Sequence, residues 1–514
     1  MSKLRHILIL CMLCFGVASS AQTYEQVMRR HVWSTSRNVN GTRQDTVSIS
    51  YVEAAAAYEG GSFRDTWQPQ RSWNAGVSTA SVRHLSDMTL SGAFSFRQHE
   101  GYDMCGSMFI RPGSFPVDAM EFTPGRKTLQ TYRFKGGLSY DTAPNFRIGA
   151  MMDFESSNIA KRKDLRHSNY RLDMTVSPGF TYRDGDITLG ANYIFRKVSE
   201  TVEPKQIGTK ESSYEAFLDK GMMYGVYSVW TGSDLHLDED GVKGFPVKET
   251  YSGMAFQLQY QDFYAEVEFL RKSGTIGEKD FIWFRYPGLE LTAHAGYKFR
   301  TGDVMHHTRL EYGWKDLDMN ESVLEKVTEG GVTNVINHGS NRILSESRWF
   351  LRPEYEYVSD EFDVLADMDL EGCHSVSSQM YPYVYRESLV TWSLGAEAKF
   401  YLENIDWDFL DFYHFRGFEL DAGLRYMDGA VRERRQIVSE DTGVQTEPYR
   451  LQEWYDRQME YATAFSLSMK IGLRYNFWKG LYVSASGEWR CGMGLRHIPG
   501  HFRSTAVMSF GYDF

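Results

Sequence analysis

The side chains most able to do chemistry in this chain are charged residues that recur at every second position of alternating segments. Basic residues gather in the N-terminal half, at Arg97, Arg133, Lys135, Arg147, Arg171, Arg183 and Arg196. Acidic residues gather in the C-terminal half, at Glu266, Glu268, Glu290, Glu354, Glu356, Asp363, Asp367, Asp369 and Glu371. If the two sets face each other across a water-filled lumen, they create a transverse field that orients and selects polar solutes. The alternative is that they pair as salt bridges and fill a closed interior.

Enzymatic or metal chemistry has little support in the sequence. No Ser or Asp stands in a recognisable hydrolase setting, where a nucleophile and a base must lie together, so we predict no enzyme activity. His306 and His307 are adjacent, so on a strand they point to opposite faces and cannot share a metal. The stretch from Asp234 to Asp240 offers carboxylates for Ca²⁺ but lacks the glutamate that completes an EF-hand loop. We expect neither a metal nor a cofactor.

Segments of alternating residues must position the charged side chains. Between Phe465 and Phe477, Leu467, Met469 and Ile471 fall on one face, while polar and glycine residues fall on the other. This period of two is typical of a strand with one apolar face. We predict about 18 strands, most of them with the ~9–11 residues that a tilted strand needs to cross a bilayer. They lie near residues 46–59, 72–82, 87–97, 130–141, 146–156, 169–183, 187–198, 250–260, 263–271, 288–300, 304–315, 345–358, 362–371, 388–402, 417–427, 461–476, 481–490 and 503–514.

The connections between these strands alternate between short and long. Short ones include Asp184–Asp186, Gln261–Asp262, Thr301–Asp303, Ser359–Glu361 and Trp478–Gly480. Long ones cover residues 98–129, 199–249, 272–287, 316–344, 372–387 and 428–460. Short periplasmic turns opposite long external loops are typical of a transmembrane β-barrel. This pattern predicts an even number of strands and places both chain ends in the periplasm.

One connection breaks the alternation. Residues 403–416 should form a short periplasmic turn, but the segment is long and carries Trp407, Phe409 and Phe412 among acidic residues. One interpretation is that the segment hides a strand pair or forms a packed cap. The other is that it is a docking surface for a periplasmic or outer-membrane protein partner.

The two ends of the chain carry signals of their own. Residues 1–21 read as a secretory signal peptide, with a basic start, a short apolar stretch and small residues before Gln22. Residues 22–45 form an N-terminal segment in the periplasm or the lumen, with a short amphipathic helix near Tyr24–His31, and residues 46–514 form the barrel. At the other end, Phe510, Tyr512 and Phe514 lie on the apolar face of a last strand.

Composition narrows the class further. The chain has 514 residues, of which 42% are hydrophobic, with a mean hydropathy of -0.44 and a formal net charge of -11. The acidic balance argues against nucleic acid as a partner. No later segment offers ~18 consecutive apolar residues, so we predict no transmembrane helix. Cys105, Cys373 and Cys491 lie beyond the leader, so at most one disulfide forms.

The leader, the alternating strands, the rhythm of the connections and the Phe514 ending together resemble outer-membrane β-barrels of the Bacteroidota, including families without assigned function. The start at Gln22 and the run from Trp33 to Gly41 look like that group as well. The resemblance implies an all-β, antiparallel up-and-down transmembrane barrel in the cell outer membrane. It also implies outer-membrane lipid and lipopolysaccharide as surroundings, and the barrel-assembly machinery as a partner.

Two functions follow from this reading. The first is a porin-like channel that passes small polar solutes through a charged lumen by diffusion. The second is a plugged accessory barrel that supports a neighbouring uptake or secretion complex and uses its long loops and residues 403–416 as contacts. The sequence does not decide whether the lumen is open.

Overall fold

The computed structural model describes residues 23–44, 48–205, 216–221, 227–230, 244–278, 281–329, 332–378, 384–404, 417–433, 451–478 and 480–514. The predicted signal peptide, the acidic stretch 234–240 and most of the connection 403–416 lie outside these ranges.

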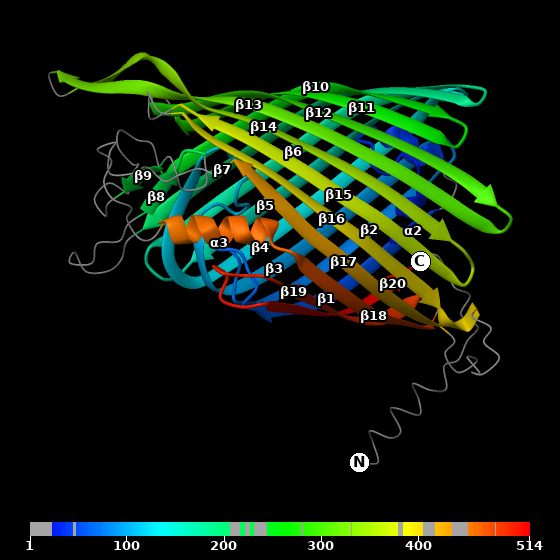
Figure 1. Cartoon of the computed structure of the whole chain (residues 1–514). Coiled ribbons are helices and arrows are strands. Elements are labelled where there is room, and N and C mark those ends of the chain that lie inside the picture. The colour runs from blue at the N-terminus through cyan, green and yellow to red at the C-terminus, as the bar shows by residue number, and fades with distance from the viewer. Residues whose placement is uncertain are drawn as a thin grey trace, which may run out of the picture.

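The chain folds into a closed barrel. Within the described ranges, a single antiparallel sheet holds 20 strands. Eighteen of them close into a ring, because the first strand pairs with both the second and the last. The remaining two, β8 and β9, form a small hairpin whose strand β8 pairs with an outer part of β4. Figure 1 shows the ring strands tilted across the barrel wall. The predicted fold class is confirmed.

The strands are bounded as follows: β1 (Ile49–Gly61), β2 (Arg71–His84), β3 (Met88–Ser107), β4 (Asp118–Ala143), β5 (Phe146–Lys161), β6 (Arg166–Asp184), β7 (Ile187–Lys205), β8 (Ala216–Asp219), β9 (Tyr227–Trp230), β10 (Phe245–Tyr260), β11 (Phe263–Glu278), β12 (Phe281–Thr301), β13 (Val304–Glu329), β14 (Val332–Val358), β15 (Phe362–Ser377), β16 (Tyr385–Tyr401), β17 (Phe418–Glu433), β18 (Ser466–Trp478), β19 (Leu481–Gly492) and β20 (Phe502–Asp513).

Each predicted strand overlaps one strand of the ring, but several strands extend farther than predicted. β13 and β14 continue their pairing out to Glu329 and Val332, so the predicted long connection 316–344 is mostly a hairpin. β3 and β4 likewise extend into the predicted connection 98–129. Beyond the membrane the residues no longer need an apolar face, so alternation fades, while the backbone groups still need hydrogen-bond partners. The predicted strand 461–476 begins too early, because its first residues belong to a helix.

Helical segments are few among the described residues. They are α2 (Tyr24–Arg30), η1 (Val39–Gln44), η3 (Leu402–Asn404) and α3 (Leu451–Thr463). α2 begins with a capping box, in which the Thr23 side chain accepts from the Gln26 backbone and the Gln26 side chain accepts from the Thr23 backbone. No helix in the described part of the chain has the length and apolar character needed to cross a membrane.

The barrel wall has an apolar outer face. On β20, Met508 is 65% exposed and Phe510 is 53% exposed, and both point away from the lumen. Aromatic rings stack on one another along one rim, as in the pair Phe418–Tyr475 at 4.3 Å between ring centroids. Such an apolar band with an aromatic border is stable in lipid and not in water.

The two ends of the barrel differ. The short connections, such as the one between Tyr260 and Phe263, lie at one end, which we name the turn end. Longer connections, such as the one between β3 and β4, lie at the opposite end, which we name the loop end. The chain finishes at the turn end, where the Asp513 amide donates to the Gly480 carbonyl at 3.0 Å. The periplasmic placement of the turn end remains a prediction.

Candidate functional site

Residues 23–44, the N-terminal segment, lie inside the lumen near the turn end. At one side of the barrel the Arg30 Nη2 lies 2.6 Å from the Asp363 Oδ2 on β15. At the other side the Asn40 Oδ1 accepts from the Ser139 hydroxyl on β4 at 2.7 Å. The segment therefore crosses the interior. The sequence predicted its helix but left its place between periplasm and lumen open.

The helix α2 is held by the acidic side of the wall. Arg30, whose side chain is 11% exposed, pairs with Asp363 and also with Glu356, at 3.3 Å. The Gln26 amide donates to the Tyr401 hydroxyl at 2.6 Å, and that hydroxyl donates to Asp363. Two carboxylates of the predicted acidic wall thus share the single positive charge of Arg30.

Trp33 anchors the middle of the segment. It is buried, its indole Nε1 donates to the Gln259 side chain at 2.6 Å, and its ring lies 5.0 Å from that of Tyr264 between centroids. Gly41 lies against the same ring, since a Cβ there would be 2.4 Å from the indole. The absence of a side chain at Gly41 lets the segment fold back over Trp33.

Glycines of the wall make room for the end of the segment. A Cβ at Gly149 would lie 2.7 Å from both the Val39 and the Asn40 side chains, and one at Gly137 would lie 2.5 Å from Val39. Glycine inside a strand often marks a close approach of another part of the chain. These inward glycines are the sequence signal that points to something seated on β4 and β5.

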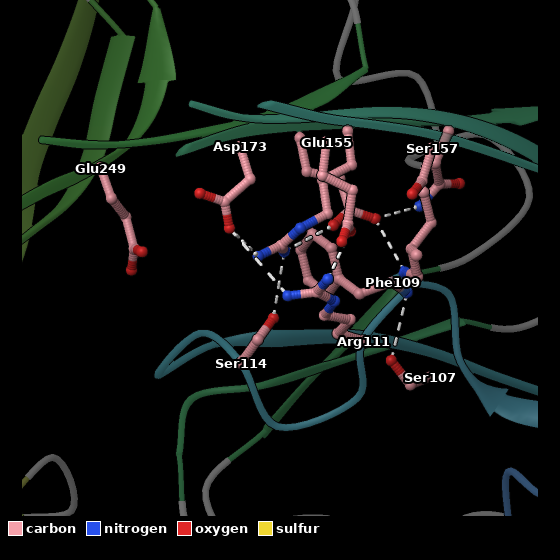
Figure 2. Close-up of polar contacts among 12 residues, drawn as sticks. Ser107, Phe109, Arg111, Ser114, Glu155, Ser157, Asp173 and Glu249 are labelled. Atoms are coloured by element: carbon pink, nitrogen blue, oxygen red, sulfur yellow. Dashed lines mark hydrogen bonds and ion pairs between the residues drawn. The ribbon is translucent and has the colours of Figure 1, made fainter. Parts of the chain in front are cut away.

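At the loop end, the connection between β3 and β4 turns into the barrel. Phe109 and Phe115 are buried there in a large apolar cluster with inward residues of the wall, such as Ile194 and Val198 on β7. In Figure 2 this connection runs beneath the wall strands, and its Arg111 points toward Glu155 and Asp173. An apolar contact and ion pairs therefore hold the connection inside the mouth.

Two of the predicted basic residues serve this inserted connection. Arg171 pairs with Glu200 at 3.2 Å, and the same carboxylate accepts from the Ile110 backbone amide at 2.8 Å. Arg196 pairs with Asp173 at 2.7 Å. Both arginines are paired with neighbouring carboxylates of the wall, so their charges do not face an open lumen.

A helix and a hairpin also cover the loop end. Figure 1 shows α3 at the same end of the barrel as β8 and β9. Tyr455 and Met459 of α3 pack with Met120 of β4 and Phe217 of β8. The Tyr455 hydroxyl donates to Glu387 on β16 at 2.8 Å. Because β4 and β16 are far apart in the ring, α3 and β8 bridge the mouth.

The remaining basic residues divide into paired and unpaired groups. Arg133 pairs with Asp153, Arg147 pairs with Asp141 at 2.9 Å, and Arg183 donates to the Gly185 carbonyl at 3.3 Å. Arg97 and Lys135 are exposed inside the barrel, and within the described residues neither makes a hydrogen bond or an ion pair.

The predicted acidic residues alternate with basic residues that the sequence reasoning missed. Arg309 pairs with Glu354, Arg425 pairs with Asp367, and Arg352 pairs with both Asp369 and Glu371. Elsewhere Glu268 pairs with Arg37, Glu290 lies 3.9 Å from Lys315, and Glu266 accepts hydrogen bonds from Tyr264 and Gln257. The missed arginines also occupy every second position, and counting both signs on each strand would have found them.

Two cavities with charged linings remain in the lumen, between the N-terminal segment and the elements that cover the loop end. One cavity of about 380 Å³ is lined by Arg309, Arg352, Asp367 and Arg425 together with Val32 of the N-terminal segment. A second, of about 310 Å³, is lined by residues that include Gln26, Glu397, Lys399 and Lys470. Leu365 lines both, so the two cavities adjoin. The side of the lumen bounded by β12–β18 is therefore not filled by side chains, and it holds charges of both signs.

Metal-binding and disulfide chemistry have no site in the described part of the chain. No group of three or more His, Cys, Asp or Glu side chains there is arranged to hold a metal ion. Cys105, Cys373 and Cys491 are free thiols.

A buried acid in the loop-end connection between β1 and β2 predicts a pH dependence of stability. Burial raises the pKa of the Asp65 carboxyl to about 7, although Thr66 donates hydrogen bonds to it. Between about pH 4 and pH 7 the folded chain keeps a proton that the unfolded chain has lost. The free energy of unfolding should therefore fall as pH rises through this window, by at most about 1.4 kcal/mol per pH unit.

This pH dependence can be measured by urea unfolding of the refolded barrel in detergent, between pH 4.5 and pH 8. We expect Asp65→Asn to reduce the slope, while buried carboxyl groups elsewhere in the chain keep part of it. Asp262→Asn, in the exposed turn between β10 and β11, is the control and should keep it. A slope that is as steep in Asp65→Asn as in the natural chain would assign the effect to other groups alone.

Comparison with known proteins gives distant matches of fold. No curated protein matches the chain. Among solved structures, the copper transporter OprC is similar over 90% of this chain and 80% of its own, with 7% identity and a TM-score of 0.40. The FrpB iron transporter from Neisseria meningitidis is similar over 91% and 82%, with 8% identity and a TM-score of 0.43. OccK8 from Pseudomonas aeruginosa is similar over 91% and 98%, with 10% identity and a TM-score of 0.32.

A family model matches residues 40–514, from the last part of the N-terminal segment to the end of the last strand. It therefore spans the whole barrel. With its closed ring of strands and its lipid-facing outer band, the chain is an outer-membrane β-barrel, and it belongs to the family of unknown function DUF6850.

Proposed function

We propose that the protein is a gated passage for small polar solutes across the outer membrane, with the N-terminal segment as its inner gate. The observation that carries this proposal is the pair of adjoining charged cavities beside the segment, lined on one side by Arg352, Asp367 and Arg425. A barrel kept only as a scaffold gains nothing from leaving charged groups hydrated, because filling the space with apolar side chains stabilises a fold.

The mechanism needs no chemical step. Neighbouring carboxylates and guanidinium groups replace part of the water around a polar solute, which lowers the cost of entering a narrow space. Along β14 and β15, positions such as Arg352 and Asp369 alternate in sign, so a solute finds both hydrogen-bond donors and acceptors. Passage requires the N-terminal segment to leave its seat on the wall.

The proposal is tested by current through the refolded protein in a planar lipid bilayer. We expect rare current steps from the natural chain and frequent ones once the anchors of the segment are removed. Correctly folded protein that conducts in neither form would contradict the proposal.

The alternative function is a plugged accessory barrel of an uptake or secretion complex. The observation that favours it is the apolar cluster at the loop end, where residues such as Phe109 and Phe245 pack together. In that case neither the natural chain nor the variant without anchors conducts current in the bilayer, and a partner protein copurifies with the natural chain. Residues 403–416 remain the predicted contact.

A further inference from the structure

Four basic side chains lie on the outer face of the barrel, one on each of four neighbouring ring strands. They are exposed, and we name them the outer basic patch: Lys197 on β7, Lys248 on β10, Arg271 on β11 and Arg285 on β12. These strands pair with one another in the order β7, β10, β11 and β12. Each cation stands at an even spacing from exposed apolar residues of its own strand, as Arg271 does from Phe269, so it shares their lipid-facing side.

The outer basic patch begins where the apolar band ends. Met254 on β10 and Phe269 on β11 are exposed and in register. The next outward position toward the loop end holds Ser252 on β10 and Arg271 on β11, which are again in register. On β7 the change to polar residues comes at Lys197. The patch therefore lies at the height where lipid chains give way to lipid headgroups.

The strand register sets the size of the patch. Lys197 lies one outward position nearer to the loop end than Arg271. Lys248 and Arg285 lie one position further still, and both are in register with Thr275. Strands are about 4.8 Å apart and successive outward residues about 6.8 Å, so the patch spans about 14 Å in each direction. Long lysine and arginine side chains can reach one large headgroup over that area.

Few carboxylates accompany these cations on the outer face. Lys248 pairs with Glu278 at 2.6 Å. In the part of the chain that the structure describes, Lys197, Arg271 and Arg285 make neither a hydrogen bond nor an ion pair. Glu203, the other outward carboxylate of these four strands, lies three outward positions beyond Lys197. The remaining glutamates of the four strands alternate to the inner face, behind the sheet: Glu200, Glu249, Glu266, Glu268 and Glu290.

The strands on either side bound the outer basic patch. On β6 the outward residue in register with Lys197 is Met174. On β13 two acidic residues, Asp316 and Asp318, face outward, and Asp318 pairs with Arg342 at 3.6 Å. Positive charge therefore prevails on the outer face from β7 to β12 and ends at β13.

We propose that the outer basic patch binds the phosphorylated sugar headgroup of lipopolysaccharide. Arginine presents paired N–H donors that match phosphate oxygens, lysine adds a point charge, and clusters of such residues at a membrane border bind anionic lipids. The hydroxyls of Thr250 and Ser273 lie between the cations and can donate to the sugar, while the acyl chains lie on the apolar band. The loop end faces the outer leaflet in the predicted orientation. The proposal does not depend on whether the barrel conducts.

The patch is tested by calorimetric titration of the refolded full-length barrel in neutral detergent. The three probes are lipid A with two phosphates, the same lipid after removal of both phosphates, and phosphatidylglycerol. We expect the phosphorylated lipid A to bind at least about tenfold more tightly than either other lipid. Lys197→Gln/Arg271→Gln should lose at least about tenfold in affinity for it, because each cation at a membrane border contributes a factor of about five.

The matched control is Arg83→Gln/Arg386→Gln, which removes two exposed outer cations elsewhere, at the turn end of β2 and on β16. It should bind lipid A within about twofold of the natural chain, because neither residue belongs to the patch. Lys197→Arg/Arg271→Lys keeps both charges and should keep the affinity. The shift of the folded barrel on unheated gels verifies folding in each variant.

Four results would overturn the proposal. One is that the natural chain does not bind lipid A, and another is an equal loss of affinity in the two glutamine variants. Equal binding of lipid A without phosphates would assign the affinity to the acyl chains. Equal binding of phosphatidylglycerol would show a general preference for anionic lipid in place of a site for lipopolysaccharide.

Discussion

Glu121→Ala should destabilise the barrel by about 3–5 kcal/mol, because it leaves two buried ammonium groups without their counter-charge. Glu121 is fully buried at the loop end, with Lys127 2% exposed and Lys161 3% exposed beside it. The Lys161 Nζ lies 2.5 Å from one carboxylate oxygen, and the Lys127 Nζ lies 3.8 Å from the other. Removing one member of such a buried cluster costs far more than removing an exposed pair.

The effect should also reach the inserted connection between β3 and β4. The Lys127 Nζ donates to the Ser107 carbonyl at 2.9 Å, two residues before the buried Phe109. Without Glu121 the two ammonium groups repel each other, and we expect this end of β4 to separate from β8, which pairs with it at Glu121. The chain should then lose its cover at the loop end before the ring itself unfolds.

Urea unfolding followed by tryptophan fluorescence measures this loss, and limited proteolysis reports the release of the loop-end cover. The control is Lys248→Ala, which breaks an exposed pair with Glu278 and should leave the unfolding midpoint nearly unchanged. Equal shifts in the two variants would show that the buried cluster contributes no more than a surface ion pair.

Arg30→Ala should release the N-terminal segment and raise the frequency of current steps by about a hundredfold or more. Arg30 is the cation that the segment places against Glu356 and Asp363, both of them buried. Without Arg30 the two buried carboxylates repel each other and lose their cation. This should destabilise the state in which the segment is bound to the wall by about 3–5 kcal/mol. Since each 1.4 kcal/mol is a factor of ten in an equilibrium, a rarely open gate becomes mostly open.

The measurement is the open fraction in planar bilayers, supported by protease access to the N-terminal segment in folded protein. Arg29→Ala is the matched control, because Arg29 lies on the same helix, is 38% exposed and is 3.7 Å from Glu354, so its loss should change little. Gly137→Leu approaches the same gate from the wall, by filling the space that Val39 occupies. If Arg30→Ala and Gly137→Leu both fold and neither opens the barrel, the segment is not the gate.

The strands were predictable from the sequence because the signal for a membrane strand is local. In β18, Met469, Ile471 and Leu473 point to lipid while Ser468 and Lys470 point inward. The type of each residue therefore indicates which face of the strand it lies on. The same rule identified the last strand from Phe510 and Phe514. It failed for the outer parts of β13 and β14, where lipid no longer selects apolar residues.

The sequence by itself determined the class of fold, the number of crossings and which residues turn inward, because alternation against lipid needs only the residue and its immediate neighbours. It also showed that charges of both signs occupy the inner face. Only the tertiary structure decided what those charges do. Arg425 finds Asp367 two strands away, Arg30 reaches Asp363 from the other end of the chain, and Arg133 shares Asp153 with Lys135 across β4 and β5. Such outcomes depend on register, strand tilt and the path of a segment through the lumen, which side-chain periodicity does not encode.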